Sequence, residues 1–209
     1  SFEQLNAEVD PDTRWVDKAD LPQEIGSDAF HGAMIYEKSA MMHMGRYVNG
    51  LADAAHRHGA MIWDRAPVTD RQRSGSRWEL TTPKGKITAD RVIAATGAYS
   101  GAYAKKPLTY FRRRIISVGS FIIATRPLTP DEIAATLPGN RTCVTSLNIG
   151  NYFRLSPDNR LIFGGRARFS AVSDQQSDAK SGAILRQSMA QIFPHLADVQ
   201  IDYCWGGLV

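Results

Sequence analysis

Apolar residues recur at helical spacing in two stretches of the chain. The first extends from about Met44 to His58 and is followed by Gly59, which is typical of a helix C-terminus. The second extends from about Asp178 to Phe193 and ends before Pro194. The two apolar stripes consist of Tyr47, Leu51, Ala54, Ala55 and His58, and of Leu185, Met189, Ile192 and Phe193. The spacing predicts two amphipathic helices, each with one apolar face.

Short apolar runs after the first helix predict strands. Residues 60–63 and 91–95 are almost continuously apolar, which is typical of strands covered on both faces. Residues 78–82 alternate in polarity and predict a strand, residues 83–85 predict a turn, and residues 87–89 predict the strand that runs back beside the first. This part of the chain therefore predicts an α/β unit with an antiparallel three-stranded insertion before its last strand.

The second half of the chain has the pattern of an antiparallel sheet with helices on one side. The elements expected there are a strand over 114–125, a short helix over 127–137 that Thr129-Pro130 begins, a hairpin turning at 156–159, and a last strand over 199–205. At the other end of the chain, residues 29–42 have strand character and residues 1–25 predict a helix or loop. A domain boundary is expected near residues 101–107.

Composition indicates a globular protein. Hydrophobic residues make up 43% of the chain and charged residues 22%. No apolar run approaches the roughly 18 residues of a membrane helix, and the first residues lack the basic and apolar regions of a signal peptide. We therefore expect a cytoplasmic protein with no membrane partner.

Charge and cysteine usage exclude several classes of partner. The net charge is +4, and the one basic cluster, Arg112–Arg114, leads straight into an apolar strand, so we expect no nucleic-acid partner. Cys143 and Cys204 lack metal-ligand spacing and are expected to be reduced thiols. The five histidines also lack that spacing, so no metal site is expected.

The stretch "RVIAATGAYS", residues 91–100, resembles the last strand of a dinucleotide-binding domain and raises the question of where a phosphate loop would lie. None of the seventeen glycines belongs to a G-x-G-x-x-G motif, and Gly97 and Gly101, four apart, are not such a fingerprint. A G-x-S-x-G elbow for acyl transfer is also missing. From its residues alone, the chain cannot hold a dinucleotide in the usual way.

Four segments in order carry a resemblance to a known family. They are "MHMGRYVNGLADAAHRHGAMIWDRAPV" (42–68), "ITADRVIAATGAYS" (87–100), "RRRIISVGSFIIATRPL" (112–128) and "YFRLSPDNRLIFGGR" (152–166). From about residue 26 to 209, the chain resembles the D-amino-acid-oxidase-like FAD-dependent oxidoreductases. Within that family of glycine and sarcosine oxidases, it is most similar to the gamma-glutamylputrescine-oxidase-like amine oxidases.

The resemblance implies an α/β (more fully α+β) fold: part of a FAD-binding Rossmann-like domain plus an antiparallel-sheet substrate domain. Residues 1–41 would lead into the substrate domain, residues 42–104 would form a partial FAD-binding domain of helix, strand, meander and returning strand, and residues 105–209 would form the substrate-binding domain. In the family the phosphate loop lies at the N-terminus and a flavin-contacting segment follows the last strand. The chain is therefore expected to be an internal fragment of a longer enzyme.

The resemblance also implies cofactor residues. The backbone of Val68 would contact the adenine, and Thr96 and Gly97 would lie beside the pyrophosphate and ribose, with the glycine allowing close approach. The alternatives are an ordinary strand residue at Val68 and a plain strand-to-loop turn at Thr96-Gly97.

Substrate residues are expected on the second sheet. Gly119 and Ser120 interrupt an apolar strand where it would near the flavin, although a β-bulge would give the same pattern. Tyr152, Arg154 and Arg166 would line the amine pocket, or they are solvated residues of a strand face. No residue is assigned a catalytic role.

The implied activity is oxidation of a small amine or amino acid by hydride transfer from the C–H next to nitrogen to FAD in the intact parent. The alternative is a non-catalytic folded fragment that binds no FAD, because it lacks the phosphate loop and the C-terminal flavin segment. Such a fragment is expected to self-associate through an exposed sheet edge near residues 92–95.

Overall fold

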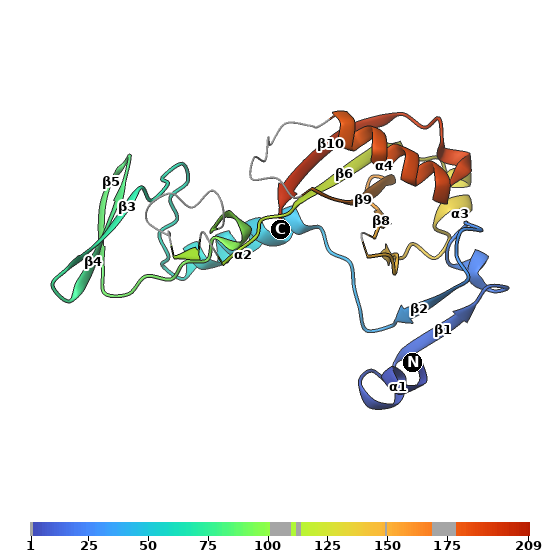
Figure 1. Ribbon diagram of the computed structural model, residues 1–209, viewed down its shortest axis with the longest axis horizontal. Coiled ribbons are helices and arrows are strands. Elements are labelled where there is room, and N and C mark those ends of the chain that lie inside the picture. Colours follow the sequence, from blue (N-terminus) through green and yellow to red (C-terminus); the bar gives the residue numbers. More distant parts are fainter. Residues whose placement is uncertain (1, 101–109, 112–113, 149, 169–178) are drawn as a thin grey trace. The chain divides into compact units, whose positions relative to one another are not determined.

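The computed structural model describes residues 2–100, 110–111, 114–148, 150–168 and 179–209 (Figure 1). The helices are α1 (Phe2–Glu8), α2 (Met44–Arg57), α3 (Pro130–Thr136) and α4 (Ala179–Ile192), with short 3-10 turns at Leu21–Gln23, Gly97–Ser100 and Pro194–Leu196. The strands are β1 (Thr13–Asp17), β2 (Gly32–Tyr36), β3 (Asp70–Ser74), β4 (Arg77–Thr82), β5 (Gly85–Ala89), β6 (Gly119–Pro127), β7 (Cys143–Val144), β8 (Tyr152–Leu155), β9 (Arg160–Arg168) and β10 (Ile201–Leu208).

These elements form two compact units. The larger unit combines the chain up to His43 with Ser120–Ala167 and the C-terminal part up to Gly206. The smaller unit consists mainly of Met44–Gly119 and also includes Gly207–Val209.

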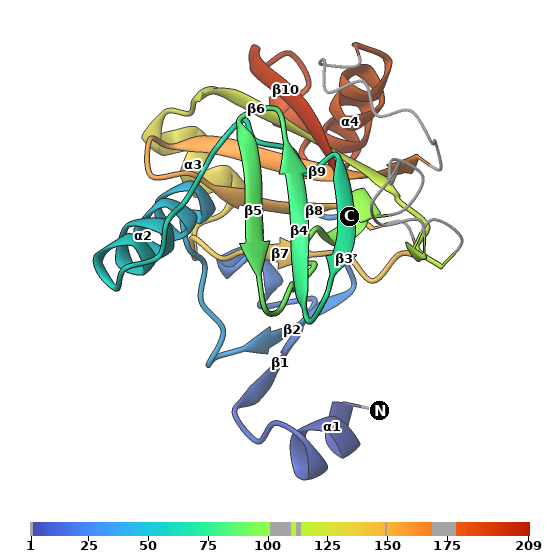
Figure 2. The same ribbon diagram turned by 90° about the vertical axis from the view of Figure 1, so that its left-hand side faces the viewer.

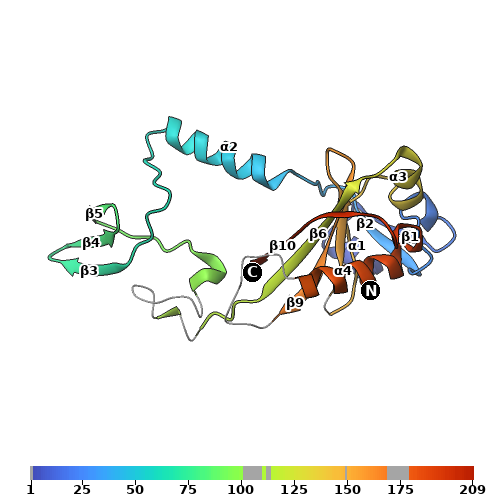
Figure 3. The same cartoon turned by 90° about the horizontal axis from the view of Figure 1, so that it is seen from above.

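The larger unit contains a five-stranded sheet in the order β10-β6-β9-β8-β7, with α4 along one face (Figures 1 and 3). Strand β8 alternates, so Phe153 and Leu155 point into the core while Tyr152 and Arg154 lie on the opposite face. The Phe153 ring stacks on Phe163 at a centroid distance of 5.6 Å and meets Phe193, just beyond α4, edge-on at 5.2 Å. This aromatic cluster joins the sheet to its helix.

Helix α3 begins as the sequence predicts. The Thr129 hydroxyl accepts from the Glu132 amide, and the Glu132 carboxylate accepts from the Thr129 amide, which together form a capping box. The guanidinium of Arg126 binds both oxygens of the same carboxylate, at 2.9 and 2.7 Å. These contacts, the Arg126 hydrogen bonds first, lower the pKa of Glu132 to about 2.

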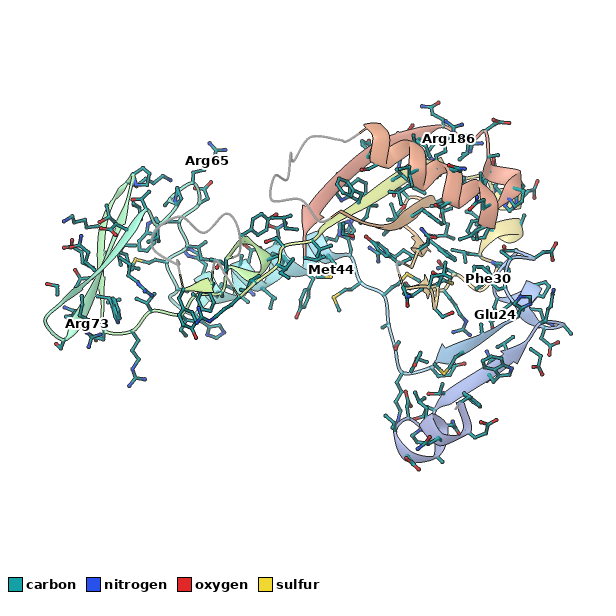
Figure 4. The ribbon with its side chains drawn as sticks, viewed as in Figure 1. Glu24, Phe30, Met44, Arg65, Arg73 and Arg186 are labelled. Carbon is teal, nitrogen blue, oxygen red and sulfur yellow. The ribbon has the colours of Figure 1, made fainter. Side chains whose placement is uncertain are left out.

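The N-terminal strands β1 and β2 form an antiparallel pair that belongs to the larger unit. Glu24 (labelled in Figure 4) accepts from Arg141 at 2.5 Å and from Arg14 at 2.9 Å, and so ties β1 to the segment before β7. Leu21 and Ile25 are buried in the same core as the sheet. The strand character predicted for residues 29–42 is confirmed by β2. For residues 1–25 the sequence predicted a helix or loop, and β1 was missed because its pairing depends on the separate segment 32–36.

The smaller unit contains α2 and the meander β3-β4-β5, which lies as three adjacent strands in Figure 2. The predicted helix is confirmed, and Gly59 just beyond it has a φ of +89°, as a helix-ending glycine does. The predicted turn and return strand are confirmed by the pairing of Thr82 with Gly85. The guanidinium groups of Arg71 and Arg73 lie over the Trp78 ring, 4.9 and 5.0 Å from its centroid. Arg73 is labelled in Figure 4.

Two predicted strands of the smaller unit are wrong. Residues 60–63 and 91–95 are not in strands, and Met61 and Ile93 are 74% and 90% exposed. A strand covered on both faces takes its hydrogen bonds from neighbouring strands, and no strand of the described residues pairs with these segments. An apolar run alone therefore did not predict a strand correctly, because a strand also needs a partner. The exposed sheet edge expected near residues 92–95 is wrong for the same reason, since this segment is no strand.

The strand expected over 114–125 is shorter at its start. It begins at Gly119 and continues to Pro127, so Gly119 and Ser120, which were expected to interrupt the strand, are its first two residues. Before it, the Ser117 hydroxyl donates to the Ala98 carbonyl at 2.5 Å. Val118 exchanges both backbone hydrogen bonds with Val209, as directly opposed residues of antiparallel strands do.

No helix within the described residues is long and apolar enough to cross a membrane.

Candidate functional site

Two of the five expected substrate residues meet on one face of the larger sheet. The hydroxyl oxygens of Ser120 on β6 and Tyr152 on β8 lie 2.8 Å apart, within hydrogen-bond distance. We call this side of the sheet the polar face; alternation along the strands places on it Ser120, Ile122, Tyr152, Arg154, Ile162 and Gly164. It is the side away from Phe153 and the aromatic core. Its five side chains, those of every residue of the face except Gly164, are partly exposed. The face thus presents a hydroxyl pair beside isoleucine side chains.

Arg154 lies on the same face but makes a structural contact. Its Nη1 donates to the backbone carbonyl of Met42 at 2.8 Å. Met42 lies just before α2, so the guanidinium holds this segment against the sheet of the larger unit. Arg154 opposes Ile162 across the β8–β9 ladder.

The two remaining predicted substrate residues, Gly119 and Arg166, contribute no described side chain to this cluster. Gly119 is buried as the first residue of β6. The side chain of Arg166 lies outside the described residues, although its backbone belongs to β9.

A further residue of this face was missed by the sequence analysis. Gly164 is paired with Tyr152 across the ladder, and a Cβ at Gly164 would lie 2.0 Å from Cε2 of that ring. The signal that could have found it is a Gly-Gly pair inside a strand, which often marks a close approach.

The expected cofactor residues lie in the smaller unit. Gly97 begins the 3-10 turn Gly97–Ser100, and the Thr96 hydroxyl hydrogen-bonds to that of Ser100. Gly97 has a φ of +51°, and a Cβ there would meet nothing within 4 Å, so a ligand has room beside its backbone. Val68, just before β3, has a side chain that is 38% exposed. Both Val68 and Gly97 are therefore accessible, as contact with a ligand would require.

Within the described residues, the Cys143 thiol is a candidate nucleophile, and the acidic and histidine side chains are candidate metal ligands. Burial raises the pKa of the Cys143 thiol to about 11, so this group is protonated at neutral pH. Among the described residues, no three histidine, cysteine, aspartate or glutamate side chains are grouped to hold a metal ion.

Comparison with known proteins identifies the class. The family described as FAD dependent oxidoreductase matches residues 1–209, and the chain belongs to that family. The predicted resemblance and the predicted mixed α/β fold are confirmed.

Individual relatives narrow the comparison. The chain is 37% identical over 192 residues to the probable oxidoreductase OrdL of Haemophilus influenzae, covering 91% of this chain and 42% of that protein. It is 30% identical over 188 residues to the gamma-glutamylputrescine oxidoreductase of Escherichia coli, covering 90% and 42%. The chain thus spans less than half the length of the curated relatives that it matches.

Solved structures share the fold. Glycine oxidase from Geobacillus kaustophilus matches with a TM-score of 0.73 and 21% identity, over 94% of this chain and 50% of that one. L-proline dehydrogenase from P. horikoshii matches with a TM-score of 0.79 and 16% identity, over 99% and 55%.

Proposed function

We propose that the whole protein oxidises a small amine or amino acid, with FAD as the hydride acceptor. The observation that carries this proposal is the Ser120–Tyr152 hydroxyl pair on the polar face, in a chain of the FAD-dependent oxidoreductase family. The relatives named gamma-glutamylputrescine oxidoreductase and glycine oxidase support the substrate class. Bound FAD supplies the ring that takes the hydride.

The polar face binds and orients the amine in this proposal. One hydroxyl of the pair donates to the other, so the pair still offers one O–H donor and free lone pairs to a substrate nitrogen. Ile122 and Ile162 on the same face exclude water from the C–H that is lost. Fixing the nitrogen in this way brings the reacting carbon into one orientation.

Arg154 favours the neutral form of a bound amine. A positive charge near an amine lowers the amine's pKa, and burial against isoleucine acts in the same direction. The neutral form is the one that has a lone pair to assist loss of hydride from the neighbouring carbon. Arg166 and Gly119 remain predicted neighbours of the same site.

Residues 42–104 would supply one side of the FAD site and the sheet of residues 105–209 the substrate side, with residues 1–41 leading into the latter. Val68 would face the adenine, and Thr96 and Gly97 would lie beside the pyrophosphate and ribose. The open space at Gly97 supports this assignment, because a side chain there would occupy it. Cys143 and Cys204 are not joined in a disulfide, which supports the expected cytoplasmic location.

A second proposal concerns the chain by itself: it folds without holding FAD, and it self-associates. The sequence has no G-x-G-x-x-G loop, and apolar side chains of the smaller unit are exposed, among them Tyr47 and Leu51 on α2 and Ile93. Exposed apolar surface of this kind favours association with another chain.

Titration of the purified chain with FAD, followed by flavin fluorescence, tests both proposals. Saturable quenching that Gly97→Asp abolishes would support the assigned cofactor residues. It would also contradict the proposal that the chain by itself holds no FAD. Fluorescence that stays unchanged through the titration would support the second proposal. The activity itself is tested in the whole protein, by bleaching of the flavin on anaerobic addition of an amine; a flavin that no amine or amino acid bleaches would contradict it.

A further inference from the structure

The two hydroxyls of the polar face come from strands that are not neighbours. In the sheet order, β9 lies between β6, which carries Ser120, and β8, which carries Tyr152. Adjacent strands are about 4.8 Å apart, so these two backbones are separated by roughly 10 Å. Because the oxygens are 2.8 Å apart, the Tyr152 side chain must cross β9 to reach Ser120.

The crossing takes place over Gly164. Tyr152 and Gly164 are directly opposed in the antiparallel β8–β9 ladder. A Cβ built on Gly164 would lie 2.0 Å from Cε2, 2.2 Å from Cζ and 2.6 Å from Oη of Tyr152. These distances are too short for non-bonded contacts. A side chain at residue 164 would therefore overlap with the hydroxyl end of the Tyr152 ring.

The backbone of Gly164 is held in place from the neighbouring strand. The Asn151 side-chain amide donates to the Gly164 carbonyl at 3.3 Å, and the Asn151 backbone N–H donates to the Thr145 hydroxyl at 2.8 Å. On the other face of the sheet, Phe163 is fully buried beneath Phe153. A larger residue at 164 could therefore be accommodated only by moving the tyrosine ring.

We propose that Gly164 is a positioning residue of the substrate site: its missing side chain forms the channel across β9 through which Tyr152 reaches Ser120. The geometry of the channel is independent of any ligand. Its importance for substrate orientation rests on the function proposed above. An alanine at 164 would turn the phenol away from Ser120 and break the hydroxyl pair.

Carbon-13 labelling of the tyrosine Cζ atoms tests the positioning directly in the purified chain, without FAD. Tyr152→Phe identifies the Tyr152 resonance by its loss, and Ser120→Ala shows how the resonance moves when the hydrogen bond is lost. We expect Gly164→Ala to shift this resonance in the same direction as Ser120→Ala. Gly207→Ala is the matched control, because a Cβ on that β10 glycine would meet nothing within 4 Å. A Tyr152 resonance that stays in place in Gly164→Ala would overturn the proposal.

A double-mutant cycle keeps the test decisive if Gly164→Ala unfolds too readily for spectroscopy. Overpacking of this kind is expected to lower the melting temperature by roughly 5 °C, and the loss should fall to less than half when Tyr152→Ala has already removed the ring. Equal losses in both backgrounds would contradict the proposal, because the clash would then not involve Tyr152.

The two proposals can fail separately. A shifted resonance together with a whole protein whose flavin no amine bleaches would sustain the role of Gly164 and refute the proposed activity. An unshifted resonance in a protein that does oxidise amines would refute the role of Gly164 alone.

Discussion

Arg154 reaches 112 residues back along the chain to donate a hydrogen bond, 2.8 Å long, to the carbonyl of Met42. This contact joins strand β8 to the last residues before α2. The same side chain was predicted to line an amine pocket, and it lies on the polar face beside Tyr152. Arg154 therefore combines a structural contact with a charge that acts on the proposed site.

Replacing Arg154 should loosen the segment before α2. In Arg154→Leu the apolar stem is kept and the hydrogen bond to Met42 is lost, so we expect faster amide hydrogen exchange over residues 41–44. Arg65→Leu is a suitable control, because Arg65 is 90% exposed at its side chain and pairs only loosely, at 3.7 Å, with adjacent Asp64. Equal exchange in wild type and Arg154→Leu would show that the contact does not hold the segment.

Glu24 and Glu37 offer a matched pair, because both contact Arg14 and Arg141. Glu24 binds them at 2.9 and 2.5 Å with a side chain 14% exposed, whereas Glu37 lies at 3.3 and 3.8 Å and is 45% exposed. We expect Glu24→Gln to lower the free energy of unfolding by about 1–2 kcal/mol and Glu37→Gln by less than about 0.5 kcal/mol. Chemical denaturation measures both, and equal losses would contradict the assignment of the tie to Glu24.

The ion pair of Arg126 with Glu132 should make stability depend on pH. The pKa of Glu132 is lowered from 4.5 to about 2 in the folded protein, so its contribution is present above pH 4.5 and is lost as the pH falls through about 2. Glu132→Gln keeps an acceptor for the Thr129 amide but not the charge. The melting-temperature difference between wild type and Glu132→Gln should therefore shrink between pH 5 and pH 2. Asp131→Asn, which removes the neighbouring carboxylate of the same helix, is the control. A difference that stays constant across this range would rule out the linkage.

Self-association of the isolated chain should depend on the segment 91–95. Ile93 is 90% exposed, and Ile93→Lys places a charge on this exposed apolar segment. Sedimentation of the variant should show a lower association constant than wild type, by about tenfold or more, since burying an unpaired charge is costly. Ile116→Lys, at a residue 81% exposed, is the control for added charge. Two variants that associate alike would place the interface elsewhere.

The sequence predicted those elements whose signals are local. The periodic stripe and Gly59 predict α2, and the Thr129 capping signal predicts α3, because each depends only on residues a few positions apart. Strand β1 and the failed strand at 91–95 show the limit of this reasoning. Whether such a segment pairs is decided by a partner that is distant in sequence.

The candidate site was predicted in its residues but not in its geometry. Ser120 and Tyr152 were both singled out, yet their contact across 32 positions depends on the register of three strands. Gly164 has no side chain that could be identified as a candidate site group in the sequence. Its importance is visible only in the structure, where Tyr152 lies over it. Residues of this kind act by leaving space, which a search for chemical groups does not detect.

The central claim, that the Ser120–Tyr152 pair orients an amine for oxidation, is tested most directly by the rate of anaerobic flavin reduction in the whole protein. We expect Tyr152→Phe to slow reduction by an amine about tenfold to a hundredfold, because the ring stays while the orienting hydroxyl is lost. Tyr203→Phe is the control in the same unit, since that ring packs under Arg160 at 5.2 Å and its hydroxyl is not invoked. A Tyr152→Phe protein that is reduced as fast as wild type would contradict the account.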